Sequence, residues 1–103
     1  SPAARCVQTV EALGRKYKIL PELGITATAD LVLQAAGWPD SRSPVLVVGH
    51  QPWLGQLAAL LLCGEKQEWT VKKANAWWIT SRERDGENEI YLRAVLAPEF
   101  FID

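Results

Sequence analysis

Residues 44–55 read Pro-Val-Leu-Val-Val-Gly-His-Gln-Pro-Trp-Leu-Gly, and this stretch decides the expected fold. The apolar run at residues 45–48 is typical of a strand buried on both faces. Gly49 permits a sharp exit from that strand, and Pro52 suits the first turn of a helix. We therefore expect His50 at the carboxyl end of a buried strand, the edge where ligands bind in open α/β sheets. The alternative is a histidine that packs or caps locally.

Composition predicts one small domain over residues 1–103. The formal net charge is −1, and acidic and basic residues are interspersed, so we expect no surface for a polyanion such as nucleic acid. The sequence contains no methionine and opens on Ser1-Pro2. We interpret it as an incomplete domain that lacks its first strand and helix.

The two cysteines, Cys6 and Cys63, form no Cys-x-x-Cys pair and have no histidine at zinc-ligand spacing. We expect reduced, packed thiols in a cytoplasmic protein. A single histidine with scattered carboxylates is too little for a transition-metal site, and neither a metal nor a cofactor is expected. No signal peptide is visible, and the apolar run at residues 57–63 is far too short to span a membrane.

Residue periodicity and turn signals predict the remaining elements. A helix should begin at Pro2 with Ser1 as its N-cap. Two more helices are expected, one at residues 31–36 between an Asp30 N-cap and Gly37, and one at residues 53–63 that ends at Gly64. Strands are expected at residues 17–23, 45–48, 74–81 and 90–96. A charged loop around Asp85-Gly86 should join the last two strands, and an apolar tail follows at residues 99–103. Trp77 and Trp78 should lie on opposite faces of their strand. This order fits a three-layer α/β domain.

Two residues at expected helix starts could bind an anion. Arg5 lies near the positive end of the first helix, where a cation is mildly unfavourable unless an anion visits; the alternative is a solvated surface arginine. Its guanidinium matches phosphate geometry, and a neutral imidazole at His50 can hold a phosphoryl oxygen, attack one or move a proton. The backbone N–H groups of Gln51 and Trp53 add oriented donors.

Other chemistries find less support in the sequence. Residues 49–52 lack the serine of a Gly-x-Ser-x-Gly elbow, and no glycine-rich phosphate loop ends in Lys-Ser or Lys-Thr. Glu22 and Asp30 flank a loop and are candidate acids, although solvated turn carboxylates are commoner. The Trp53 side chain either lines a pocket mouth or packs under its helix.

Two stretches resemble defining motifs of the histidine phosphatase superfamily, which includes phosphoglycerate mutases and acid phosphatases. Residues 1–9, Ser-Pro-Ala-Ala-Arg-Cys-Val-Gln-Thr, are similar to the family's Ser-Pro-x-x-Arg-x-x-Gln-Thr helix start. Residues 45–52 are similar to its strand followed by Gly-His. Residues 20–23, Leu-Pro-Glu-Leu, and the carboxyl-terminal strand pair look most like the SixA-type phosphohistidine phosphatase branch.

The resemblance implies a three-layer α/β/α fold, with a mostly parallel sheet between helices and the active site at the carboxyl ends of its strands. Carried over by motif position, Arg5 would bind the phosphoryl oxygens. His50 would contact the phosphoryl group and stabilise the transition state, and the N–H of Gln51 would donate to it. A phosphate or sulfate ion would fit the same site.

Two departures from the family pattern limit what the resemblance implies. The family's Arg-His-Gly motif supplies the nucleophilic histidine, and it is absent from these residues. His50 cannot fill both roles. Larger members place a glutamate just after the position of Leu23, where this chain has Gly-Ile-Thr at residues 24–26. A missing acid suits a phosphoramidate, because imidazole is a better leaving group than an alkoxide.

The expected function of the intact protein is therefore that of a phosphatase acting on phosphohistidine of a protein, with a histidine-phosphorylated signalling protein as a candidate partner. Residues 1–103 should be nearly inactive alone, since they lack the nucleophile. One alternative is a small-molecule phosphomonoesterase or mutase of the same superfamily. The other is a non-catalytic module that binds phosphate or a phosphoprotein.

Overall fold

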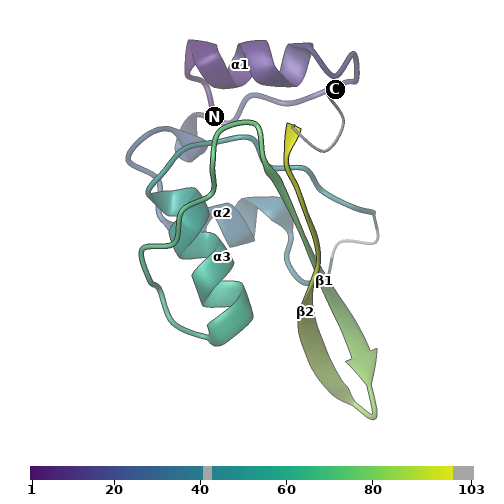
Figure 1. The fold of residues 1–103 in the computed structure, drawn as a ribbon. Coiled ribbons are helices and arrows are strands. Elements are labelled where there is room, and N and C mark those ends of the chain that lie inside the picture. The colour runs from purple at the N-terminus through teal and green to yellow at the C-terminus, as the bar shows by residue number, and fades with distance from the viewer. Residues whose placement is uncertain (41–42, 99–103) are drawn as a thin grey trace.

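The computed structural model describes residues 1–40 and 43–98. Its elements, in chain order, are α1 (Ala4–Glu11), the short 3₁₀ helix η1 (Pro21–Leu23), α2 (Ala29–Ala36), α3 (Trp53–Cys63), β1 (Ala76–Arg84) and β2 (Glu87–Leu96). Helix α1 lies at one end of the molecule, α2 and α3 form its middle, and the hairpin of β1 and β2 projects at the opposite end (Figure 1). The apolar tail predicted at residues 99–103 lies outside the described residues.

The ends of α2 and α3 agree with the glycine signals in the sequence. Gly37 and Gly64 follow the two helices in the left-handed conformation, with φ of 72° and 80°. This conformation suits glycine and closes the last helical turn. The prediction of α3 at residues 53–63 is confirmed.

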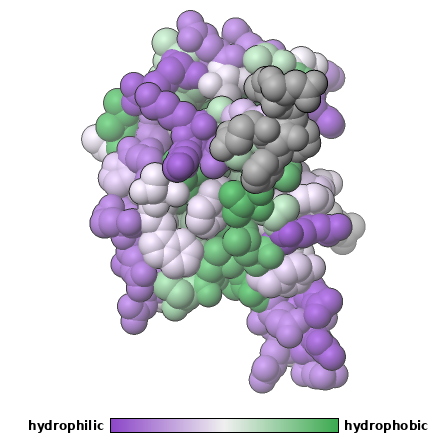
Figure 2. All heavy atoms as spheres, in the orientation of Figure 1, coloured by the Kyte–Doolittle hydropathy of each residue, from purple (hydrophilic) through white to green (hydrophobic). Residues whose placement is uncertain are grey.

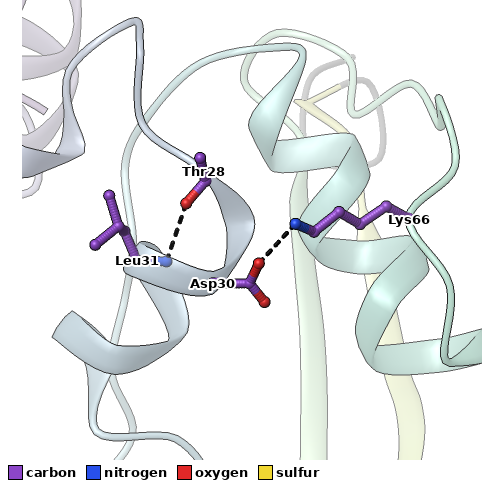
Figure 3. A network of polar contacts seen from close by, with 4 residues as sticks. All are labelled: Thr28, Asp30, Leu31 and Lys66. Atoms are coloured by element: carbon purple, nitrogen blue, oxygen red, sulfur yellow. Dashed lines mark hydrogen bonds and ion pairs between the residues drawn. The ribbon is translucent and has the colours of Figure 1, made fainter.

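The predicted N-caps of α1 and α2 are both wrong. Helix α2 is capped by Thr28, whose side chain accepts a hydrogen bond from the N–H of Leu31 at 3.3 Å. Asp30 lies in the first turn instead and forms an ion pair with Lys66 at 2.6 Å (Figure 3). Helix α1 starts after Ala3, which provides no side-chain cap, because the Ser1 hydroxyl contacts a residue far along the chain.

Strands β1 and β2 form an antiparallel hairpin that is longer than predicted. The turn residues Asp85 and Gly86 have φ of 53° and 79°, as a two-residue hairpin turn with matching strand twist requires. The charged residues expected in a loop are paired within the ladder: Arg82 lies opposite Glu89 and forms an ion pair with it at 2.9 Å. Exposed strands can carry such cross-strand charge pairs without burying an apolar face.

The predicted three-layer α/β/α architecture with a mostly parallel sheet is wrong. The sheet found in residues 1–40 and 43–98 has two antiparallel strands, and residues 45–48 are not among them. Val45 and Leu46 are 53% and 67% exposed. The expected strand at residues 17–23 is replaced by irregular backbone at residues 17–20 and the η1 turn. A parallel strand needs hydrogen-bonded neighbours and cover on both faces, and neither is provided around these residues.

The hydrophobic core is small and lies between α2, α3, η1 and the segment that leads to His50. Its buried members are Leu23, Val32 and Trp53, with Leu20, Ala27, Val47, Leu54 and Leu57 packed around them. Trp53 is the largest fully buried side chain among the described residues, at 1% exposure. Its indole N–H donates to the carbonyl of Gly24 at 3.0 Å, so the one polar atom of this ring is satisfied. The core therefore fixes the start of α3, immediately after His50.

The surface combines apolar patches with a charged hairpin tip. Hydrophobic side chains gather in the middle of the face shown in Figure 2, and hydrophilic ones cover the tip of the hairpin. Trp77 is half-buried and Trp78 is 48% exposed, which agrees with opposite faces of β1. The Arg93 guanidinium lies over the Trp78 ring, 4.3 Å from its centroid. No helix in the described part of the chain combines the length and apolar character needed to cross a membrane.

Candidate functional site

The local backbone places His50 at the junction between an extended segment and α3. Its carbonyl accepts the N–H of Leu54 at 2.8 Å, so the first turn of α3 grows directly from this residue. Gly49 lets the chain pass against the core: a Cβ there would lie 1.9 Å from the Trp53 ring. The His50 and Trp53 rings meet edge to face, with centroids 6.2 Å apart. His50 is 5% exposed.

Helix α1 brings Arg5 to this histidine from 45 residues away in the sequence. One terminal guanidinium nitrogen of Arg5, Nη2, lies 3.2 Å from Nδ1 of His50. Arg5 as a whole is an exposed residue. The structure thus brings together the two residues that the sequence pattern indicates separately, an exposed arginine and a buried histidine.

Two residues that sequence reasoning did not assign to the site complete the surroundings of His50. The Ser1 hydroxyl forms a hydrogen bond with Nε2 of the ring. The Cys6 thiol donates to the carbonyl of Gly49 at 3.5 Å, and its sulfur lies 3.6 Å from Nε2. The sequence pattern favours Ser1 as a helix cap and Cys6 as a packed thiol. The sequence signal that could have placed them at the site is their position within residues 1–9, the same stretch that contains Arg5.

The two cysteines differ from each other. Cys6 is buried, as predicted, whereas Cys63 at the end of α3 is exposed, so the prediction of a packed thiol there is wrong. Both are free thiols. The reason lies in helix geometry: Cys63 occupies the last turn of α3, beyond the part that packs against the core. Its sulfur donates to the carbonyl of Glu65 at 3.7 Å.

The donors and acceptors around His50 define its hydrogen positions. An arginine side chain can only donate, so Nδ1 must present its lone pair to Arg5. In a neutral ring the proton then resides on Nε2 and is donated to the Ser1 hydroxyl. The Ser1 oxygen also accepts the N–H of Ala3 at 3.3 Å. His50 is therefore held as one defined tautomer.

The surroundings also oppose a positive charge on His50. Burial lowers the pKa of His50, and the Arg5 guanidinium lowers this pKa further by repulsion. The ring should thus be neutral at physiological pH, since an unperturbed histidine already titrates near 6.5. A neutral ring retains the lone pair that Arg5 contacts.

Titration of His50 should show this effect directly. Because its folded pKa lies below that of the unfolded chain, both states are neutral above about pH 6.5. As the pH falls below that value, the unfolded chain binds a proton before the folded chain does, and the free energy of unfolding decreases. This decrease is complete once the pH has fallen through the folded pKa. We expect an NMR titration of the single histidine to give a pKa below 6.5. A value at or above that of a denatured control would contradict the geometry.

Gln51 and the two candidate acids, Glu22 and Asp30, differ in the contacts that they make. The Gln51 side chain accepts the N–H of Gly55 and donates to the carbonyl of Trp69, each at 2.8 Å, so it fastens the start of α3 to the loop that follows the helix. Its backbone N–H, the group predicted to donate to a ligand, makes no hydrogen bond to the rest of the described chain. Asp30 is engaged by Lys66, and Glu22 is exposed in η1.

Two depressions of about 310 and 430 Å³ lie on the hairpin, lined by residues between Arg82 and Tyr91. Both are open and lined in part by charged side chains, and neither is lined by Arg5 or His50. We place the candidate site at the buried polar cluster instead, because that is where an imidazole and a guanidinium converge. No group of three or more His, Cys, Asp or Glu side chains in the described ranges could hold a metal ion.

Comparisons of the chain with protein-family models, curated proteins and solved structures found no match. The resemblance to histidine phosphatases therefore rests on the motifs at residues 1–9 and 45–52.

Proposed function

We propose that Arg5 and His50 bind a phosphoryl group, and that the intact protein is a cytoplasmic phosphatase acting on phosphohistidine of a protein. The observation that carries this proposal is the 3.2 Å approach of the Arg5 guanidinium to Nδ1 of His50. A guanidinium supplies a planar fork of donors that fits phosphate oxygens. An imidazole beside it can donate to the same group once a ligand displaces the Arg5 contact.

The first turn of α1 supports anion binding as well. Ala3 provides no side-chain acceptor for the N–H groups that follow it, and Arg5 belongs to the same turn. Helix starts carry partial positive charge and unpaired N–H groups, which favour anions. His50 would act as a stabiliser, since its Nδ1 faces the arginine, and the attacking nucleophile would be a second histidine outside these residues.

The substrate class follows from the candidate acids. Asp30 is paired with Lys66, and the position where larger relatives carry a glutamate is occupied by Gly24, Ile25 and Thr26. A phosphoramidate needs less help from an acid than an alkyl phosphate does, because imidazole leaves readily. This supports phosphohistidine over a small-molecule phosphomonoester.

A second candidate function is a module that binds phosphate or a phosphoprotein without turnover. The observation that favours it is the presence of a single histidine, engaged by Arg5. The 103-residue chain is expected to bind the anion and to leave phosphohistidine intact. Substantial hydrolysis of a phosphohistidine protein by this chain would contradict the assigned role of His50.

Binding of inorganic phosphate tests both candidates. We expect Arg5→Ala and His50→Ala to weaken phosphate binding by about 10- to 100-fold, because each removes a hydrogen bond to a charged group. Arg5→Lys keeps the charge without the fork and should lie between the wild type and Arg5→Ala. Binding can be measured by calorimetry and by the NMR signals of His50.

The control for this experiment is Arg15→Ala, which removes an exposed arginine beyond α1 and should leave the phosphate affinity unchanged. Equal losses in Arg5→Ala and Arg15→Ala would indicate general electrostatic attraction and would contradict a site at Arg5. Circular dichroism of each variant confirms that it is folded.

A further inference from the structure

Among the described oxygen and nitrogen partners of the His50 ring, Ser1 is the one whose hydrogen bond can reverse, since Arg5 only donates. The Cys6 sulfur lies 3.6 Å from Nε2 and 3.8 Å from Nδ1, but a thiol is a weak donor and acceptor, and this one also donates to the carbonyl of Gly49 at 3.5 Å. A serine hydroxyl rotates freely and can accept from Nε2–H or donate to a bare Nε2. The side chain of Ser1 thus matches either tautomer of the ring, whereas Arg5 matches one.

A phosphoryl oxygen changes what His50 must do. In the structure Nδ1 carries a lone pair that faces the Arg5 N–H. A phosphoryl oxygen placed between these two groups is an acceptor, so it can be held by Arg5 directly but by His50 only if Nδ1 carries a proton. The ring can meet this demand as an imidazolium or as the other neutral tautomer.

We propose that Ser1 is a positioning residue that allows His50 to bind a phosphoryl group as a neutral ring, by switching from hydrogen-bond acceptor to donor. This inference rests on the proposed function. In the free state Nε2–H donates to Ser1 and Nδ1 accepts from Arg5. In the bound state Ser1 O–H donates to Nε2, and Nδ1–H donates to the phosphoryl oxygen.

The exchange conserves protons. Nδ1 takes one proton from solvent, Nε2 releases one to solvent, and the hydroxyl proton of Ser1 stays on its oxygen and turns toward the ring. No bond other than N–H is made or broken. The imidazolium alternative would place a charge on a ring that is 5% exposed and in contact with Arg5, and it would leave Ser1 an acceptor throughout. Burial and repulsion by Arg5 already disfavour that charge.

The free-state half of the proposal is tested by nitrogen-15 NMR of the single histidine at pH 7.5, where each ring nitrogen reports whether it carries a proton. The wild type is expected to show one tautomer with the proton on Nε2. Arg5→Ala removes the donor that faces Nδ1, so the two tautomers should become mixed, while Ser1→Ala leaves that donor in place and should keep the proton on Nε2. Ser81→Ala, a hydroxyl loss in β1, is the matched control and should leave the ring signals unchanged.

The bound-state half uses inorganic phosphate as the probe. Saturating phosphate is expected to move the ring proton of the wild type from Nε2 to Nδ1 at constant ring charge. Ser1→Ala should weaken phosphate binding by about three- to tenfold, the effect of one neutral hydrogen bond, and Ser1→Thr should recover the affinity. Ser1→Val fills the volume of threonine without its hydroxyl and should leave the affinity at the level of Ser1→Ala, whereas a cavity effect alone would let valine recover it.

The outcomes separate this inference from the proposed function. Phosphate binding that depends on Arg5 but leaves the proton on Nε2, or protonates both nitrogens, overturns the role of Ser1 and leaves the phosphate site standing. Phosphate affinity that is unchanged in Ser1→Ala also overturns it. Absence of any phosphate binding to the wild type overturns both proposals.

Discussion

Replacing Trp53 by alanine is expected to lower the free energy of unfolding by about 3–5 kcal/mol, the range seen when a large buried aromatic ring is truncated. Trp53 is 1% exposed and belongs to the core cluster with Leu23 and Val32. Its loss would leave a cavity and remove the donor for the carbonyl of Gly24. Since small domains are stable by only about 5–15 kcal/mol, this variant should be close to unfolding at room temperature.

The matched control for this variant is Trp78→Ala. Trp78 is 48% exposed and contacts Arg93 on the hairpin, so its loss should cost about 1 kcal/mol or less. Urea unfolding followed by far-ultraviolet circular dichroism gives both values. Trp53→Phe retains most of the apolar volume and should lie between the wild type and alanine. Equal losses in Trp53→Ala and Trp78→Ala would show that the core is not organised around Trp53.

Replacing Gly49 by alanine is expected to have the second largest effect, a loss of about 1–3 kcal/mol or more from overpacking. The added methyl group would lie 1.9 and 2.0 Å from two atoms of the Trp53 ring. Because Trp53 is held by the core and by Gly24, the backbone at residues 49–50 must move instead. His50 would then shift relative to Arg5, so phosphate binding should weaken together with stability.

Gly24→Ala is the matched glycine control. Gly24 has a negative φ of −70°, and a Cβ there would meet only the carbonyl oxygen of Pro21, at 3.4 Å. This variant should unfold within about 0.5 kcal/mol of the wild type, as surface substitutions usually do. A Gly49→Ala protein with wild-type stability and phosphate affinity would show that the indole can move aside without cost.

Elements governed by local chemistry were predictable from the sequence. Gly37 and Gly64 mark helix ends because a left-handed residue closes a helix regardless of its surroundings. The Asp85-Gly86 pair specifies a tight hairpin in the same way. The length of the two strands was harder to predict. Their composition near the turn indicates a loop, but the cross-strand ion pair of Arg82 and Glu89 stabilises these residues as strand.

Elements that depend on distant partners were not predictable. The apolar run at residues 45–48 has strand composition, but a strand exists only beside another one, and Leu46 instead lies exposed. For the candidate site, motif spacing selected Arg5 and His50, whose side chains do approach each other. The contact of Ser1 with His50 was not predicted, because the sequence pattern indicates a local role for Ser1 as a helix cap. A contact with a residue 49 positions away leaves no local pattern in the sequence.

The polar contacts of α1 with distant parts of the described chain are concentrated in and just before its first turn. They run from Ser1, Arg5 and Cys6 to residues 48–50, and they are the same contacts that form the candidate site. The contacts that hold α1 against the rest of the described chain are thus the contacts that form the site. Under the proposed function, the apparent affinity for phosphate would equal the intrinsic affinity multiplied by the fraction of molecules in which α1 is packed against the rest of the chain. Sequence changes that only loosen this helix act on binding without touching the ligand.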